Sequence, residues 1–219
     1  MRFKAVIFDL DGTLVNSLDD IADSCNEALR RCGYPVHSIE QYPLFVGQGI
    51  RNLVRFAMPL NLQADEQKID ACFNLFFDIY RNNCCRKTAA YPGIADVVAR
   101  LREKGVKMAV LSNKADGLTQ IVVNTLFEKG VFGLVLGPSA TLSRKPDPAG
   151  VLRICETFGV GLSETLLVGD SKYDILTARN AGVKCVAVSW GFQPRKAIEE
   201  HCPDKVVDST DELLRYILS

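Results

Sequence analysis

Two carboxylates near the start of the chain, Asp9 and Asp11, stand two residues apart directly after the apolar run 5–8. In an extended segment, residues two apart point to the same side, so both carboxylates are expected at the same end of a strand. Carboxylates held together repel each other and resist desolvation unless a cation or a shared proton compensates. The pair therefore predicts a metal site, although alone it also fits a strand-ending turn with Asp9 as a helix cap.

Two further polar segments follow later apolar runs. Ser112 and Asn113 come directly after residues 108–111, where a hydroxyl and the free amides of a helix start can hold phosphate oxygens. Lys145 precedes a proline, which favours an extended conformation and holds the lysine on a stiff loop. Each segment alone has a simpler interpretation, a helix cap for Ser112 or Asn113 and a solvated surface position for Lys145.

A last pair of carboxylates follows the apolar run 166–168. Asp170 and Asp174 are four residues apart at a strand-to-helix junction, so both can face the same site from one helical turn. Capping by Asp170 is the alternative for this pair alone. Coincidence is a poor explanation for all four segments, because each follows a predicted strand and would therefore lie at the same edge of a sheet.

The elements that must position these residues alternate along the chain. Uniformly apolar runs indicate strands buried on both faces, and segments with apolar residues three or four apart indicate the helices between them. This alternation predicts an α/β fold with a parallel sheet, helices on both faces and a ligand site beyond the carboxyl ends of the strands. The predicted strands are 5–8, 108–111, 134–136, 166–168, 185–188 and 206–207, and the predicted helices are 93–105, 114–129, 147–158 and 173–181.

One stretch breaks the alternation. Residues 15–86 show helical periodicity and no convincing strand, with one apolar stripe from Ile21 to Cys32 and another from Ile69 to Tyr80. A connection of about a hundred residues between two strands of a sheet favours a helical domain inserted into the α/β core. We expect the core to comprise residues 1–14 and 87–219, and the insert to act as a lid over the strand ends.

The composition excludes several classes of protein. Lys and Arg total 26, Asp and Glu total 26, and no basic block predicts binding to nucleic acid. The first residues lead straight into an apolar strand, and no run is long enough to span a membrane, so we expect a cytoplasmic protein. The eight cysteines show no C-x-x-C spacing and are expected to be mostly small buried hydrophobes.

Together, the motifs Asp9-Leu10-Asp11-Gly12-Thr13, Leu111-Ser112-Asn113, Lys145-Pro146 and Gly169-Asp170-Ser171 with Asp174 resemble those of the haloacid dehalogenase-like hydrolase superfamily. The resemblance covers essentially the whole chain, and the helical insert resembles the cap domain of that family. It implies a Rossmann-like core with an inserted helical cap, and a magnesium-dependent phosphatase that forms an aspartyl-phosphate.

Roles for individual residues follow from this resemblance. Asp9 is expected to be the nucleophile and Asp11 the acid and base, while Ser112, Asn113 and Lys145 bind phosphate, Ser112 and Lys145 as part of the catalytic group. Magnesium prefers oxygen ligands, which Asp9, Asp170 and the main-chain carbonyl of Asp11 supply. Thr13 and Asp174 are expected to support these groups, Asp174 by orienting Lys145 or a metal-bound water.

The substrate should be read by the insert, because the core motifs contact only the phosphoryl group. The segment around Gly47 and Gly49 looks like one in phosphoglycolate phosphatases, where two glycines could present amides to a small anion and Arg51 could pair with a carboxylate. An interhelical turn and a solvated arginine are the alternatives. We therefore expect a small phosphorylated metabolite, best matched by 2-phosphoglycolate, and a monomer or homodimer. A β-phosphoglucomutase-like enzyme and a non-catalytic regulator that binds a phosphometabolite are the alternative functions.

Overall fold

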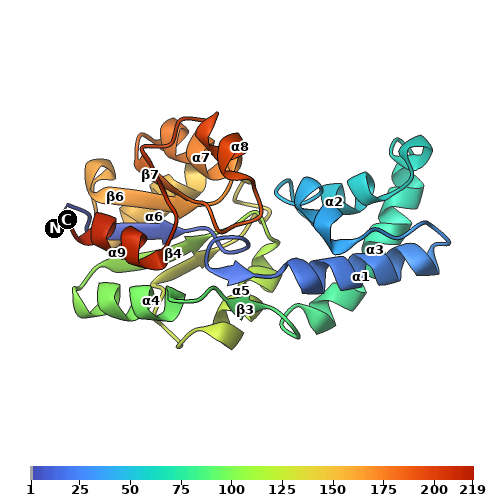
Figure 1. The fold of residues 1–219 in the computed structure, drawn as a ribbon, viewed down its shortest axis with the longest axis horizontal. Coiled ribbons are helices and arrows are strands. Elements are labelled where there is room, and N and C mark those ends of the chain that lie inside the picture. Colours follow the sequence, from blue (N-terminus) through green and yellow to red (C-terminus); the bar gives the residue numbers. More distant parts are fainter. Residues whose placement is uncertain (1) are drawn as a thin grey trace. The chain divides into compact units, whose positions relative to one another are not determined.

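The computed structural model describes residues 2–219, which form two compact units. One unit comprises the chain up to Asn16 together with Ala90–Ser219, and the other comprises Ser17–Ala89. Figure 1 shows the sheet and its helices in the first unit and a group of helices in the second.

The first unit is built on a parallel sheet of six strands in the order β5-β4-β1-β6-β7-β8. The predicted α/β class is confirmed, because apolar runs such as Ala-Val-Ile-Phe are completely buried as strands. The strands are β1 (Ala5–Phe8), β4 (Lys107–Leu111), β5 (Leu134–Leu136), β6 (Thr165–Gly169), β7 (Lys184–Val188) and β8 (Lys205–Val207).

The register of the central strands aligns their carboxyl ends. Phe8 of β1 lies opposite Val110 of β4 and Val168 of β6. The loops that leave these three strands therefore begin at the same edge of the sheet, where the predicted site residues follow.

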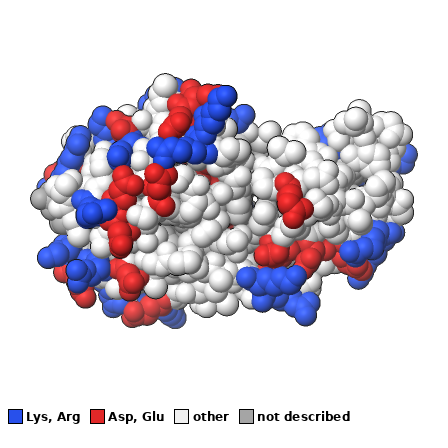
Figure 2. All heavy atoms as spheres, in the orientation of Figure 1, with Lys and Arg blue, Asp and Glu red and all other residues white. Residues whose placement is uncertain are grey.

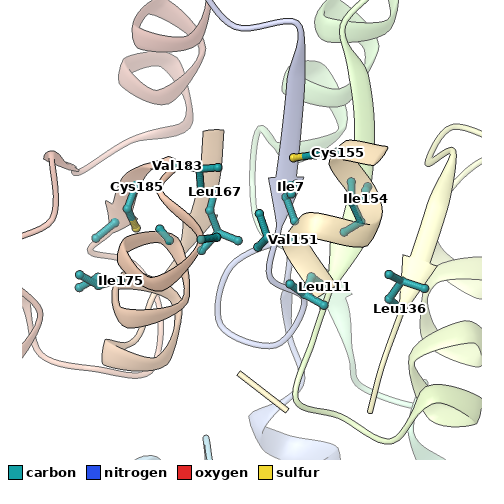
Figure 3. Packing of buried hydrophobic residues seen from close by; sticks show 14 of the residues in the cluster. Ile7, Leu111, Leu136, Val151, Ile154, Cys155, Leu167, Ile175, Val183 and Cys185 are labelled. Carbon is teal, nitrogen blue, oxygen red and sulfur yellow. The ribbon is translucent and has the colours of Figure 1, made fainter. Parts of the chain in front are cut away.

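Helices cover both faces of this sheet. On one face, Ile7 and Leu167 pack with Val151 and Ile154 of α6 and with Ile175 of α7 (Figure 3). Neighbouring residues of a strand point to opposite faces. Phe8 accordingly packs away from this cluster, edge-on against Phe132, and α4 packs against β4 and α9. The helices are α4 (Ile94–Glu103), α5 (Asp116–Leu126), α6 (Ala149–Phe158), α7 (Lys172–Ala181), α8 (Arg195–Glu199) and α9 (Thr210–Leu218), with a 3-10 turn, η3, at Leu162–Glu164.

The second unit is helical, as the periodicity of residues 15–86 predicts. Its helices are α1 (Leu18–Arg31), α2 (Ile50–Ala57) and α3 (Glu66–Asn83), with 3-10 turns η1 (Ile39–Leu44) and η2 (Leu60–Leu62). The two predicted stripes face each other, because α1 and α3 pack together with Cys25 and Leu29 of one and Cys72 and Phe76 of the other buried.

The buried carboxylate of Asp20 ties the two ends of this unit together. It accepts hydrogen bonds from the Lys87 amide at 2.9 Å, the Thr88 amide at 2.8 Å and the Thr88 hydroxyl at 2.7 Å. One aspartate on α1 thus satisfies three donors from a segment more than sixty residues later.

The expectation that residues 15–86 contain no strand was wrong at its first two residues. β2 (Val15–Asn16) and β3 (Ala89–Ala90) form a separate two-stranded sheet. A strand of two residues is too short to show alternation, so no pattern in the sequence could reveal it.

The surface and the cysteines agree with the composition. All eight cysteines are free thiols, five are buried, and Cys202 alone is exposed, in the turn before β8 at the amino-terminal edge of the sheet. Figure 2 shows acidic and basic side chains interspersed over the α/β unit on the face in view. Within residues 2–219 no helix combines the length and the apolar character that crossing a bilayer requires.

Candidate active site

Asp9 is the first residue after β1 and is almost completely buried. Its Oδ1 atom accepts a hydrogen bond from the Leu10 amide at 2.7 Å and lies 2.8 Å from Lys145 Nζ. The Asp9 amide donates to the carbonyl of Val168, which fixes the residue at the end of the sheet. The carboxylate is therefore held from two sides through one oxygen.

Lys145 lies between two carboxylates. Its Nζ atom is 2.8 Å from Asp9 and 2.6 Å from Asp174, and its side chain is only 2% exposed. The interpretation of Lys145 as a solvated surface residue is therefore wrong. Burial by itself lowers the pKa of the lysine, but the charges of Asp174 and Asp9 outweigh burial and hold that pKa above its ordinary value.

Asp170 and Asp174 lie at the junction of β6 and α7. Asp174 closes a capping box, because its Oδ2 accepts from the amide and hydroxyl of Ser171 while Oδ1 binds Lys145. Asp170 does not cap the helix, because its Oδ2 accepts from the Phe192 amide at 2.8 Å. The capping role that Asp170 allowed in the sequence thus belongs to Ser171.

Three glycines lie so close to Asp170 and Asp174 that any side chain on them would collide with these carboxylates. A Cβ atom on Gly12 would stand 2.2 Å from Asp170 Oδ2, and one on Gly191 would stand 2.3 Å from Asp170 Cβ. A Cβ atom on Gly169 would stand 2.1 Å from Asp174 Cγ. The two acidic side chains therefore depend on the absence of side chains at three other positions.

Three acidic side chains of this group lie close together. Oxygens of Asp9, Asp170 and Asp174 all lie within 4.8 Å of one another. Burial and the charge of Asp174 raise the pKa of Asp9 to about 7 against the opposing effect of Lys145, and burial and the charge of Asp9 raise the pKa of Asp170. Three buried carboxylates against one lysine form the hard, oxygen-rich environment that suits magnesium. The residues therefore fit this ion.

Ser112 and Asn113 follow β4 at the same edge. The Ser112 Oγ atom accepts from the Lys114 amide at 3.1 Å. The Asn113 side chain accepts from the Lys145 amide at 2.8 Å and donates to the Lys145 carbonyl at 3.1 Å. Asn113 thus clamps the main chain of Lys145 in addition to any part it has in binding phosphate.

The motifs of the α/β unit match a known family over most of the chain. A family model described as haloacid dehalogenase-like hydrolase matches residues 6–188. The chain belongs to this family. It is 33% identical over 214 residues to phosphoglycolate phosphatase 1 of Pseudomonas aeruginosa, an alignment that covers 96% of this chain and 78% of that protein.

Other relatives of this hydrolase family extend the similarity to the full length. Phosphoglycolate phosphatase of Psychrobacter arcticus is 31% identical over 223 residues, which cover 100% of this chain and 97% of that protein. Among solved structures, a predicted phosphoglycolate phosphatase from Haemophilus somnus matches with a TM-score of 0.89 at 30% identity, covering 99% and 98% of the two chains.

Within the haloacid dehalogenase-like hydrolase core, the sequence did not reveal the partner of Asp11. Lys114 Nζ lies 2.9 Å from Oδ1 and 3.1 Å from Oδ2 of Asp11. The Lys114 side chain is 2% exposed and that of Asp11 is 19% exposed. The position of Lys114, directly after Ser112-Asn113 at a strand end, was the available signal.

Thr13 closes the loop after β1. The side chain is completely buried, and its hydroxyl has no hydrogen-bond partner among residues 2–219. Its carbonyl accepts from the indole of Trp190 at 3.2 Å. Trp190 therefore holds the loop after β1 from the segment that follows β7, and the same segment places Phe192 against Asp170.

The predicted substrate-reading residues lie in the helical unit. Gly47 and Gly49 have positive φ angles of 105° and 84°, and Gly49 directly precedes α2. Arg51 is not available for a substrate carboxylate in this structure, because it pairs with Glu66 at 2.7 Å and with Asp70 at 2.6 Å. Two acidic residues of α3 that the sequence pattern did not single out explain this difference.

Proposed function

We propose that this chain is a magnesium-dependent phosphatase that hydrolyses a small phosphomonoester, with 2-phosphoglycolate as the preferred substrate, through an aspartyl-phosphate on Asp9. The observation that carries the proposal is a buried carboxylate held 2.8 Å from a buried lysine at the carboxyl edge of the sheet. Membership of the hydrolase family and the phosphoglycolate phosphatases among its relatives support it.

Asp9 would act as the nucleophile. A phosphate dianion repels an attacking carboxylate, so fixed positive charge must lie beside both groups. Lys145 provides such a charge and also holds Oδ1 of Asp9, which leaves Oδ2 for the bond to phosphorus. The Ser112 hydroxyl, which uses an acceptor position for the Lys114 amide, keeps its hydrogen for a phosphoryl oxygen.

Asp9 and Asp170 would hold the magnesium ion through their side chains, and Asp11 through its main-chain carbonyl. The ion would neutralise charge on the phosphoryl oxygens. Asp174 lies 2.6 Å from Lys145, so Asp174 would serve to orient the Lys145 ammonium group.

Asp11 would move protons in both half-reactions. It gives a proton to the departing alkoxide oxygen while phosphorus bonds to Asp9, and it takes a proton from the water that then hydrolyses the acyl-phosphate. One carboxyl group thereby returns to its starting state after each turnover.

The helical unit would act as the cap that reads the rest of the substrate, with Gly47 and Gly49 presenting main-chain amides to a small anion. Eight free thiols suit a reducing compartment, and we place the protein in the cytoplasm as a monomer or homodimer.

The test is phosphate release from phosphoglycolate, hexose phosphates and nucleoside monophosphates, with magnesium and with EDTA. We expect turnover only with magnesium and the highest kcat/KM for phosphoglycolate. Asp9→Asn should remove at least about 10³-fold of kcat while the fold is kept. Substantial turnover by a folded Asp9→Asn protein would contradict the assignment of the nucleophile. Sugar isomerisation that needs a bisphosphate primer would instead indicate a mutase.

A further inference from the structure

The contact between Lys114 and Asp11 is unusual among the ion pairs of this chain because the lysine is almost completely buried and reaches both oxygens of the carboxylate. The distances of 2.9 Å and 3.1 Å are nearly equal. Most ion pairs of the chain join exposed side chains, such as Lys87 with Asp23 and Arg102 with Glu128. Exposed pairs contribute little, whereas a buried one fixes the direction of both groups.

The main chain of Lys114 is itself held in place. Its amide donates to Ser112 Oγ, and its carbonyl accepts from the Thr119 hydroxyl at 2.9 Å. Gly137 packs so closely that a Cβ atom there would stand 2.5 Å from the Lys114 carbonyl oxygen. The ammonium group of Lys114 therefore projects from a fixed main chain.

We propose that Lys114 is a positioning residue that holds the Asp11 carboxyl group in the orientation needed for proton transfer to the leaving oxygen. This inference rests on the proposed phosphatase function. In the step concerned, the bond from phosphorus to the leaving oxygen breaks, its electron pair stays on that oxygen, and the proton of the Asp11 carboxyl group moves to it. Asp11 becomes a carboxylate, and phosphorus bonds to Asp9.

The two buried lysines contact different carboxylates, which supports separate roles for them. Lys145 pairs with Asp9 and Asp174, whereas Lys114 pairs with Asp11. Loss of the ammonium group removes two close contacts to the Asp11 carboxyl group, and a misplaced acid loses most of its effect. General acid catalysis contributes about 10²- to 10⁴-fold, and only esters with a poor leaving group need it.

The experiment compares two substrates without a carboxylate, ethyl phosphate and p-nitrophenyl phosphate. Ethoxide needs a proton to leave, and p-nitrophenolate does not. The quantity measured is kcat/KM with magnesium, because it reports the steps up to release of the leaving group and is unaffected by later hydrolysis of the acyl-phosphate. The proteins are the wild type, Lys114→Met, Asp11→Asn, the double variant, and Lys129→Met as an exposed control.

We expect Lys114→Met to lower kcat/KM for ethyl phosphate at least about tenfold more than for p-nitrophenyl phosphate. In the Asp11→Asn background, removing Lys114 should add no further difference between the two esters, because the group that it positions is gone. Lys129→Met should match the wild type. Thermal melting of each variant establishes that it is folded.

Equal losses for both esters in a folded Lys114→Met protein would overturn the inference and assign Lys114 to phosphate binding or to structure. A loss confined to phosphoglycolate, with ethyl phosphate unaffected, would also overturn it and make Lys114 a ligand of the substrate carboxylate. A wild type that hydrolyses neither ester nor phosphoglycolate would overturn the proposed function, and this inference with it.

Discussion

At the scale of single residues, the site depends on missing side chains as much as on charged ones. Gly12 combines a positive φ angle of 85° with direct contact to the Asp170 carboxylate, whereas Gly105 has a φ angle of 71° with nothing within 4 Å of a Cβ atom. Substituting each glycine therefore distinguishes the effect of the left-handed backbone conformation from the effect of a steric clash with Asp170.

Gly105→Ala should destabilise the protein by about 1 kcal/mol and leave turnover unchanged, because only the left-handed conformation is penalised. Gly12→Ala should also displace Asp170 and lower kcat by at least about 10²-fold. Thermal melting and phosphate release measure the two effects. Equal activity of the two folded variants would show that Asp170 can move without loss.

The sequence predicted the residues at strand ends and missed those that depend on side-chain direction. Asp9, Lys145 and Asp170 could be brought together because parallel strands end at one edge, and the structure places them there. The contact of Lys114 with Asp11 could not, because sequence spacing does not say where a lysine on a loop points. The pairing of Arg51 with Glu66 and Asp70 was missed for the same reason, since these acidic residues lie on another helix.

At the scale of elements, Asp20 connects α1 to the end of the helical unit, because its buried carboxylate accepts hydrogen bonds from three donors. Asp20→Asn replaces one accepting oxygen with an amide that donates, so it should lower the free energy of unfolding by about 2 kcal/mol. Asp23→Asn, one turn further along α1 and exposed, is the control and should change it by less than about 0.5 kcal/mol. Chemical denaturation measures both changes. Similar losses of unfolding free energy in the two variants would show that Asp20 has no special structural role.

Glu66 links α2 and α3 through Arg55 and Arg51, and their hydrogen bonds lower its pKa from 4.5 to about 2. A carboxylate with a depressed pKa stabilises the fold above its unfolded pKa, and this contribution is lost as the pH falls through the folded pKa. The difference in melting temperature between wild type and Glu66→Gln should therefore be constant above about pH 5 and shrink towards about pH 2. Because Glu66 is exposed, the difference in melting temperature should be small and should decrease in high salt. A difference that grows on acidification would contradict this account.

The sequence predicted the longer strands and helices well, because their apolar residues follow a clear pattern of spacing. β2 was missed because two residues carry none. The brace from Trp190 to the Thr13 carbonyl joins residues 177 positions apart, and no local pattern encodes such a bond.

At the scale of the whole molecule, magnesium binding should stabilise the folded chain, because the unfolded chain cannot assemble Asp9 and Asp170. At about one hundred times Kd, the ion should add about 2.7 kcal/mol to the free energy of unfolding. We expect a rise in melting temperature with magnesium, its loss in EDTA, and no rise in Asp170→Asn. Asp96→Asn, on the exposed side of α4, should respond as the wild type. An unchanged response in Asp170→Asn would place the ion elsewhere.

The single exposed thiol offers a practical route to observing the protein at work. Cys202 lies before β8, at the edge of the sheet opposite the strand ends that Asp9 and Asp170 follow. A maleimide dye attached there would leave the chemistry untouched. Paired with a second dye introduced on the helical unit, it would allow single-molecule energy transfer to follow the separation of the two units during catalysis.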